Sequence, residues 1–171
     1  MKTFKLDFIV CKVKPFFEKD LLIECFSEKY GRVKLLAKYA QGKSKRFSGK
    51  LETTYYLRGV VYKGKSFYIL TDCDIISPFL AIRDSYNSLL CAFYMLDIIT
   101  FSTQQIQQNK PLFNLLLNAL TALDRSPSDF FEIQSKFQLN VLKLEGLITD
   151  KVNELSFVDF KKVFENYSHV P

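Results

Sequence analysis

Histidine, tryptophan and closely paired cysteines are scarce or missing in this chain of 171 residues. The single histidine, His169, lies two residues from the end of the sequence, which leaves no histidine base for catalysis. Cys11, Cys25, Cys73 and Cys91 contain no C-x-x-C pair, the spacing from which structural zinc sites are built. We therefore expect a protein that is not an enzyme, has no metal or other cofactor, and buries its cysteines as small apolar residues.

Long hydrophobic runs are also missing. The longest run, residues 89–96, ends at Asp97, far short of the ~20 residues that a membrane-spanning helix needs. Charged residues interrupt the first seven positions, so we expect no export signal and a cytoplasmic protein. Hydrophobic residues make up 48% of the chain and charged residues 25%, which is typical of a folded globular protein.

Acidic residues are absent between Glu28 and Glu52, although the intervening stretch is strongly basic. Residues 1–80 hold 16 Lys and Arg against 8 Asp and Glu, whereas residues 81–171 hold 8 against 10. A solvated face usually mixes both signs of charge, so an unrelieved basic stretch indicates a polyanionic partner. The alternative is a mobile basic loop without a function.

Strand-like patterns occupy the first half of the chain. Apolar and polar residues alternate from 4 to 13, a run that we expect Pro15 to end, and further strands are predicted at 20–27, 32–40, 53–62 and 66–73. Residues 41–49 are predicted to form a loop, and Lys63-Gly64-Lys65 a tight turn. Five short strands, the first three consecutive and antiparallel, suit a small closed barrel.

Helical periodicity begins after Ser77-Pro78, which places a capping residue before a proline in the first turn. Helices are predicted at 83–101, 111–123, 127–147 and 157–167. The sequence therefore predicts a barrel followed by a helical unit.

The third predicted strand places cations on one face. Arg32, Lys34 and Lys38 share one parity, and same-face side chains lie about 6.6 Å apart, which suits a phosphate backbone. The loop that follows adds Lys43, Lys45, Arg46 and Lys50. Among the aromatic residues, Tyr39, Tyr56, Tyr62 and Tyr68 suit core packing better than base stacking, whereas Phe47 lies in a polar loop where burial is harder to arrange.

Catalytic alternatives rest on few residues. Asp72 and Asp74 could hold a divalent ion, but no third carboxylate is close in sequence. Gly42-Lys43-Ser44 lacks the preceding glycine of a phosphate-binding loop. A metal-dependent nuclease and a small RNA-binding barrel protein stay open beside a DNA-binding protein, because cations directed at the backbone do not distinguish DNA from RNA.

Two motifs resemble the N-terminal domain of the bacterial recombination mediator RecO family. The first is Glu18-x-Asp20-Leu21-Leu22; the second runs from Phe26-Ser27 through Gly31-Arg32 to Ala37-Lys38 and is followed by Gly49-Lys50-Leu51. The resemblance implies an α+β protein, with an OB-fold barrel of five strands at residues 1–77 and an all-helical protein-interaction domain at 78–171.

The resemblance also implies a function in recombinational DNA repair. Such a protein binds single- and double-stranded DNA, anneals complementary strands and, with RecR, helps load RecA onto strands coated by single-stranded-DNA-binding protein. In a bacterial cell it would associate with the nucleoid. Arg32, Lys34 and Lys38 match the family's basic strand, and Lys43, Lys45 and Arg46 fall in its basic loop. Lys136-Phe137-Gln138-Leu139 is similar to the family's R-F-E-L segment, which makes Lys136 a candidate ligand for the acidic tail of the coating protein.

This chain departs from the family pattern at several positions. Lys38-Tyr39-Ala40-Gln41 stands where the family usually has K-G-A-[RK], so one glycine and one cation are missing. Many members carry a four-cysteine zinc module after the position of Gly146, but no cysteine follows Cys91 here. We therefore predict a short form without zinc.

Overall fold

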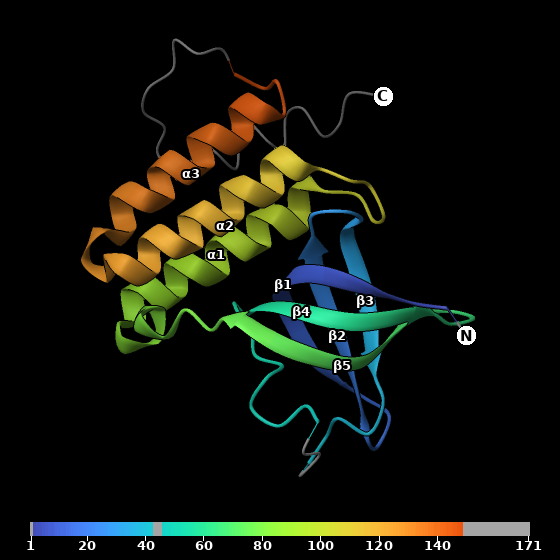
Figure 1. Cartoon of the computed structure of the whole chain (residues 1–171). Helices are drawn as coiled ribbons and strands as arrows, with labels where there is room; N and C mark the ends of the chain where they lie inside the picture. The colour runs from blue at the N-terminus through green and yellow to red at the C-terminus, as the bar shows by residue number, and fades with distance from the viewer. Residues whose placement is uncertain (1, 43–45, 149–171) are drawn as a thin grey trace.

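Five strands form a closed barrel in a computed structural model that describes residues 2–42 and 46–148 (Figure 1). They are β1 (Thr3–Phe16), β2 (Asp20–Ser27), β3 (Gly31–Ala37), β4 (Tyr56–Lys63) and β5 (Tyr68–Ser77). The order around the barrel is β1-β2-β3-β5-β4, and only the β3–β5 pair is parallel. This is the OB-fold architecture that we expected.

Alternation along the strands fills the barrel. Phe8, Ile23, Val33 and Leu57 point inward and are buried, because successive strand residues face opposite sides of the sheet. Gly59 is needed where β4 crosses this core, since a Cβ there would lie 2.6 Å from the Leu70 side chain and 2.9 Å from the Phe8 ring. The inner residues thereby fix the register, and the outer residues are left for other contacts.

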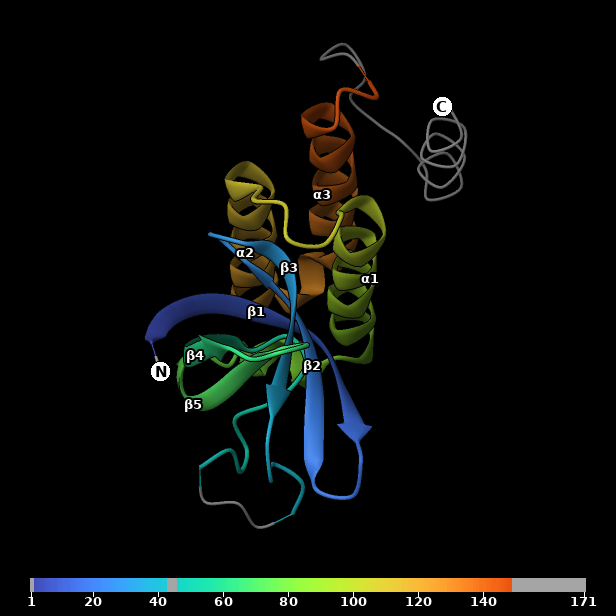
Figure 2. The ribbon, with the colours of Figure 1, turned by 90° about the vertical axis from the view of Figure 1, so that its right-hand side faces the viewer.

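Three α-helices cover one end of the barrel, and the loop between β3 and β4 lies at the opposite end (Figures 1 and 2). They are α1 (Tyr86–Ser102), α2 (Lys110–Arg125) and α3 (Phe130–Leu144), and the 3-10 turns Leu80–Asp84 and Pro127–Asp129 precede α1 and α3. Ser85 caps α1 and Asn109 caps α2 through side-chain hydrogen bonds to the helix backbone. No helix among the described residues is both long and apolar enough to cross a membrane.

A second core joins the helices to the barrel. The side chains of Ile9 and Phe26 point outward from the strands into the helical core. There the centroids of the Phe26 and Phe113 rings lie 6.0 Å apart. Tyr56 packs against Phe113 as well, with its ring centroid at 6.1 Å. Both faces of the strands are thus buried at this end of the barrel.

The β2–β3 turn is also fastened to the segment between α1 and α2. The backbone N–H of Ile106 donates a 2.9 Å hydrogen bond to the Arg32 carbonyl, and Arg32 forms an isolated parallel bridge with Gln105. Gly31 makes the approach possible, because its φ is +63° and a Cβ there would lie 1.9 Å from the Gln107 carbonyl oxygen.

The strand ends differ from the sequence prediction in several places: β4 begins at Tyr56 and not at residue 53, and β5 spans Tyr68–Ser77 and not 66–73. Pro15 does not end β1, which continues to Phe16 with Pro15 opposite Leu21. Since β1 pairs with β4 only up to Ile9, a proline beyond that point breaks no pairing with β4. The third strand ends at Ala37 and not at residue 40, because Tyr39 has a φ of +56° that a strand does not allow. The helix predicted at 157–167 lies outside the described residues.

Candidate nucleic-acid interface

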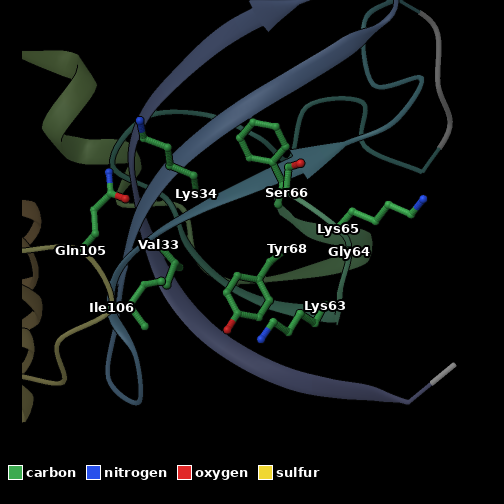
Figure 3. Close-up of a pocket in the computed structure, with 10 residues that line it drawn as sticks. Val33, Lys34, Lys63, Gly64, Lys65, Ser66, Tyr68, Gln105 and Ile106 are labelled. Carbon is green, nitrogen blue, oxygen red and sulfur yellow. The ribbon is translucent and has the colours of Figure 1, made fainter.

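A groove of about 490 Å³ runs along the side of the barrel beside β3 (Figure 3). Its walls come from β3, from the β4–β5 turn, and from the segment that joins α1 to α2. Three lysines line it, Lys34 on β3 with Lys63 and Lys65 at the turn, and no acidic residue is among the lining residues. Tyr68 adds a ring next to Lys63.

Lys34 belongs to a band of cations that crosses the outer surface of the first three strands. The register places Lys12 opposite Glu24, and Glu24 opposite Lys34. A hydrogen bond from Lys14, at 2.9 Å, and the charges of Lys14, Lys34 and Lys12 lower the pKa of Glu24 despite its partial burial. One carboxylate thus faces three lysines, and the surface keeps a net positive charge.

Three further cations of the basic stretch, Lys38, Arg46 and Lys50, belong to the connection between β3 and β4 at the end of the barrel opposite the helices. Lys38 follows β3 and is exposed. Arg46 donates a 3.2 Å hydrogen bond to the Thr71 carbonyl, and Lys50 donates one of 2.8 Å to the Cys73 carbonyl. Arg46 and Lys50 therefore attach the β3–β4 loop to β5, although Arg46 stays exposed. Lys43 and Lys45 lie outside the described residues.

The expectation that Phe47 resists burial is wrong. Its side chain is only 4% exposed and joins the barrel core together with Ala40 and Leu51. A reverse turn returns the chain here, with the Lys50 N–H donating to the Phe47 carbonyl at 3.1 Å. The turn brings Phe47 back against the barrel, so that its polar neighbours in the sequence do not keep it exposed. Phe47 is unavailable for stacking on a base.

Arg32 also departs from the predicted row. Its guanidinium donates a hydrogen bond to the Thr100 carbonyl in the last turn of α1, and its Nε atom is buried. Helix C-termini present carbonyls without intrahelical partners, which attract cations. The strand parity is as predicted, but the guanidinium of Arg32 contacts α1, and of the two cations Arg32 and Lys34 only Lys34 lines the groove.

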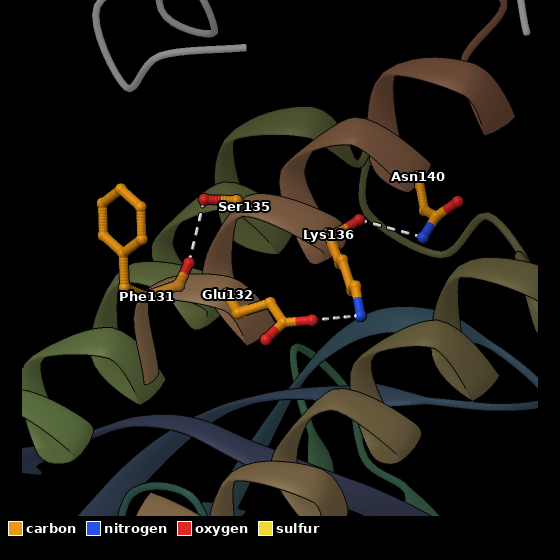
Figure 4. A network of polar contacts seen from close by, with 5 residues as sticks. All are labelled: Phe131, Glu132, Ser135, Lys136 and Asn140. Atoms are coloured by element: carbon orange, nitrogen blue, oxygen red, sulfur yellow. Dashed lines mark hydrogen bonds and ion pairs between the residues drawn. The ribbon is translucent and has the colours of Figure 1, made fainter. Parts of the chain in front are cut away.

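Lys136 is exposed on α3, an element that contributes no residue to the groove. Its ammonium forms an ion pair with Glu132 one turn earlier (Figure 4). This hydrogen bond lowers the pKa of Glu132. Phe137, the next residue, is 1% exposed and belongs to the helical core. An acidic ligand of Lys136 has to compete with Glu132.

Sequence reasoning missed Lys12, Lys63 and Lys65. Their signal was present, because Lys12 and Lys14 alternate with apolar residues and Lys63-Gly64-Lys65 was already predicted as a turn. What the sequence does not show is that β3 pairs with β5, which brings this turn to the face that carries Lys34. Within the described residues no cluster of three or more His, Cys, Asp or Glu side chains is placed to hold a metal ion.

Comparison with known families agrees with this architecture. The family profile described as Recombination protein O N terminal matches residues 1–79, and the one described as Recombination protein O C terminal matches residues 83–150. The chain belongs to the RecO family. The two RecO profiles together cover the barrel and the three helices.

Several curated RecO proteins resemble this chain, and each is named DNA repair protein RecO. The protein of Acetivibrio thermocellus is 30% identical over 146 residues, which cover 85% of this chain and 58% of the relative. That of Thermodesulfovibrio yellowstonii is 31% identical over 140 residues, covering 81% and 54%. That of Clostridium novyi is 26% identical over 146 residues, covering 85% and 57%. The chain spans little more than half the length of these relatives.

Proposed function

We propose that this chain acts in recombinational DNA repair as a DNA-binding mediator. It binds single- and double-stranded DNA and anneals complementary strands without catalysing a covalent step. Membership of the RecO family and the names of its relatives support this function. The observation that carries it is the groove beside β3, which three lysines line without an acid.

The chemistry of the groove fits this activity. Lysines spaced along a groove bind phosphates without reading bases, so the bases stay free to pair with a second strand. Lys38 and Arg46 extend the positive surface toward the far end of the barrel. Binding of two backbones by one positive surface reduces their mutual repulsion and promotes annealing.

The partners of the mediator are proposals too. The chain would help load RecA onto strands coated by single-stranded-DNA-binding protein, in cooperation with RecR. The helical half would receive the acidic tail of the coating protein, and Lys136 is the proposed ligand of a tail carboxylate. The exposure of Lys136 on α3 supports this role.

Annealing of complementary oligonucleotides coated with single-stranded-DNA-binding protein tests the proposal. The wild-type chain should accelerate annealing, and Lys34→Ala with Lys65→Ala should slow it. In polarisation titrations the same double variant should lower the slope of log affinity against log salt by about 2, since two phosphate contacts are lost.

Arg125→Gln is a control for the loss of a single positive charge away from the groove, because Arg125 lies at the end of α2. It should leave the salt slope unchanged. Failure of the wild-type chain to anneal coated strands, together with tighter binding to RNA than to DNA, would instead support the small RNA-binding barrel protein.

A further inference from the structure

Two aromatic residues at the far end of the barrel combine strong exposure with an unfavourable backbone. Phe17, in the β1–β2 turn, is 81% exposed and has a φ of +54°. Tyr39, just after β3, is 68% exposed and has a φ of +56°. Residues other than glycine rarely adopt this backbone conformation, and the burial of these two rings is too small to compensate for its cost. Residues held in this way often serve a binding site.

Hydrogen bonds fix the two backbones to each other. The Tyr39 N–H donates to the Asp20 carboxylate at 2.9 Å, and the Gln41 side-chain amide donates to the Phe17 carbonyl at 2.9 Å and to the Asp20 carbonyl. The Gln41 N–H also donates to the Lys19 carbonyl at 3.0 Å. Both rings are therefore presented by one braced structure, which joins the β1–β2 turn to the chain leaving β3.

A row of rings connects this structure to the groove. The Phe17 ring packs edgewise on Phe16 at 4.5 Å, and Phe16 packs edgewise on Phe67 at 5.6 Å. Phe67 lies in the β4–β5 turn and is one of the groove-lining residues. The rings thus extend from the lysine-lined groove to the exposed turn.

Basic residues accompany the rings. Lys65 is two residues from Phe67, Lys14 is two residues from Phe16, and Lys38 is next to Tyr39, and all three lysines are exposed. The carboxylate of Asp20 is occupied by the Tyr39 N–H, while Glu18 is an exposed acid in the same turn. Phosphates beside lysines and bases beside rings together describe a single-stranded nucleic acid.

We propose that Phe17 and Tyr39 stack on the unpaired bases of a single strand that leaves the groove, and so make the chain prefer single-stranded over duplex DNA. A duplex offers its phosphates to the lysines but keeps its bases stacked inside. The inference rests on the proposed DNA-binding function and adds the strand preference and the residues that set it.

Polarisation titrations of the full chain with labelled oligothymidylate and with a duplex of equal length test the preference. Phe17→Ala and Tyr39→Ala should each weaken binding to the single strand about tenfold and leave duplex binding unchanged. Neither variant removes a charge, so the salt slope should stay at its wild-type value. Phe131→Ala, a control at a residue that is 75% exposed on α3, should change neither affinity.

A fluorescence measurement reports stacking directly. The chain has no tryptophan, so Tyr39→Trp introduces a single reporter. Its emission should be quenched by oligothymidylate and much less by the duplex. Circular dichroism and thermal melting verify that each variant is folded; Tyr39→Gly, which suits the positive φ, supplies a second variant without the ring.

The possible outcomes separate this inference from the proposed function. If the wild-type chain binds no DNA, both are wrong. If it binds DNA but Phe17→Ala and Tyr39→Ala bind the single strand as tightly as wild type, only the stacking inference is overturned. If the wild-type chain instead self-associates in sedimentation and these variants are monomeric with unchanged DNA affinity, the rings form a protein contact and the inference is again overturned.

Discussion

The guanidinium of Arg32 donates a hydrogen bond to the carbonyl of Thr100, and so joins the start of β3 to the last turn of α1. Arg32 was expected to bind a phosphate, yet its charge holds the barrel and the helices together. Lys34, two residues further on the same face of β3, lines the open groove. Neighbouring cations on one strand face thus have different roles.

Arg32→Met should therefore act mainly on stability. It keeps the length of the alkyl chain but loses a charged hydrogen bond, so the free energy of unfolding should fall by roughly 1.5–3 kcal/mol. Lys34→Met is the matched variant, with a change within about 0.5 kcal/mol in stability and a weaker affinity for DNA. Urea unfolding measures the first quantity and polarisation the second. Equal stability of the two variants would contradict the assignment of Arg32.

Gly31→Ala tests the close contact between the β2–β3 turn and the α1–α2 segment. A Cβ at this position would overlap the Gln107 carbonyl, and φ is +63°, so unfolding should become easier by more than about 2 kcal/mol. Gly146→Ala has a similar φ of +71° with nothing within 4 Å, so its cost should be only about 1 kcal/mol. Thermal melting measures both variants. If Gly146→Ala lowers the melting temperature more than Gly31→Ala does, the close contact at Gly31 is not needed for stability.

The ion pair between Lys14 and Glu24 should make stability depend on pH on the acidic side. Its hydrogen bond lowers the pKa of Glu24 below the ordinary value of 4.5. The folded state therefore holds the ionised carboxylate more strongly than the unfolded chain does, and this stabilisation is present above pH 4.5 and lost as the pH falls through the lowered pKa.

Lys14→Met should reduce that acid-side loss of stability, and Glu24→Gln should remove it. Once Lys14 is replaced, the further replacement of Glu24 should change the unfolding curve less than it does in the wild-type chain, because only the charges of Lys34 and Lys12 still act on the carboxylate. Urea unfolding between pH 3 and 7, roughly the range over which a carboxylate changes its charge, gives the comparison. Fully additive effects of the two substitutions would contradict the pairing.

Glu132 should oppose the binding of an acidic tail to Lys136. Lys136→Ala should weaken binding of a fluorescent peptide with the acidic, hydrophobic tail of single-stranded-DNA-binding protein, whereas Glu132→Gln should strengthen it, because the ammonium loses its competing carboxylate. Calorimetric titration measures both. If Glu132→Gln weakens binding of the peptide and Lys136→Ala binds it like wild type, the tail binds elsewhere on the protein.

The four cysteines should react slowly in the folded protein. All four are free and buried, as the sequence predicted. Burial raises the pKa of Cys11 to about 12 and those of Cys73 and Cys91 to about 11, and it raises the pKa of Cys25 as well. At pH 8, about half a unit below the pKa of an ordinary cysteine, little thiolate is then available. An aromatic disulfide reagent should label none rapidly before denaturation and four per chain afterwards.

Sequence periodicity predicted the barrel and its helices well, because alternation and turn residues are local signals. The β4–β5 turn was recognised from Lys63-Gly64-Lys65. The cap predicted at Ser77-Pro78 was wrong, because Ser77 is the last residue of β5 and α1 is capped by Ser85. The groove was not predictable, since it depends on β3 pairing with β5, on residues far apart in the chain. The burial of Phe47 and the contact of Arg32 with α1 were not predictable for the same reason, because the residues that they contact come from other parts of the fold.

The groove beside β3 takes one wall from the barrel and another from the segment between α1 and α2. A ligand that fills the groove would contact the barrel and the α1–α2 segment at once, and it would bind only when the helices are packed against the barrel. By thermodynamic linkage, the ligand would then raise the midpoint of thermal unfolding of the helices as well as that of the barrel. A substitution that loosens the docking, such as Gly31→Ala, would weaken binding without touching the ligand, and docking and affinity would change together.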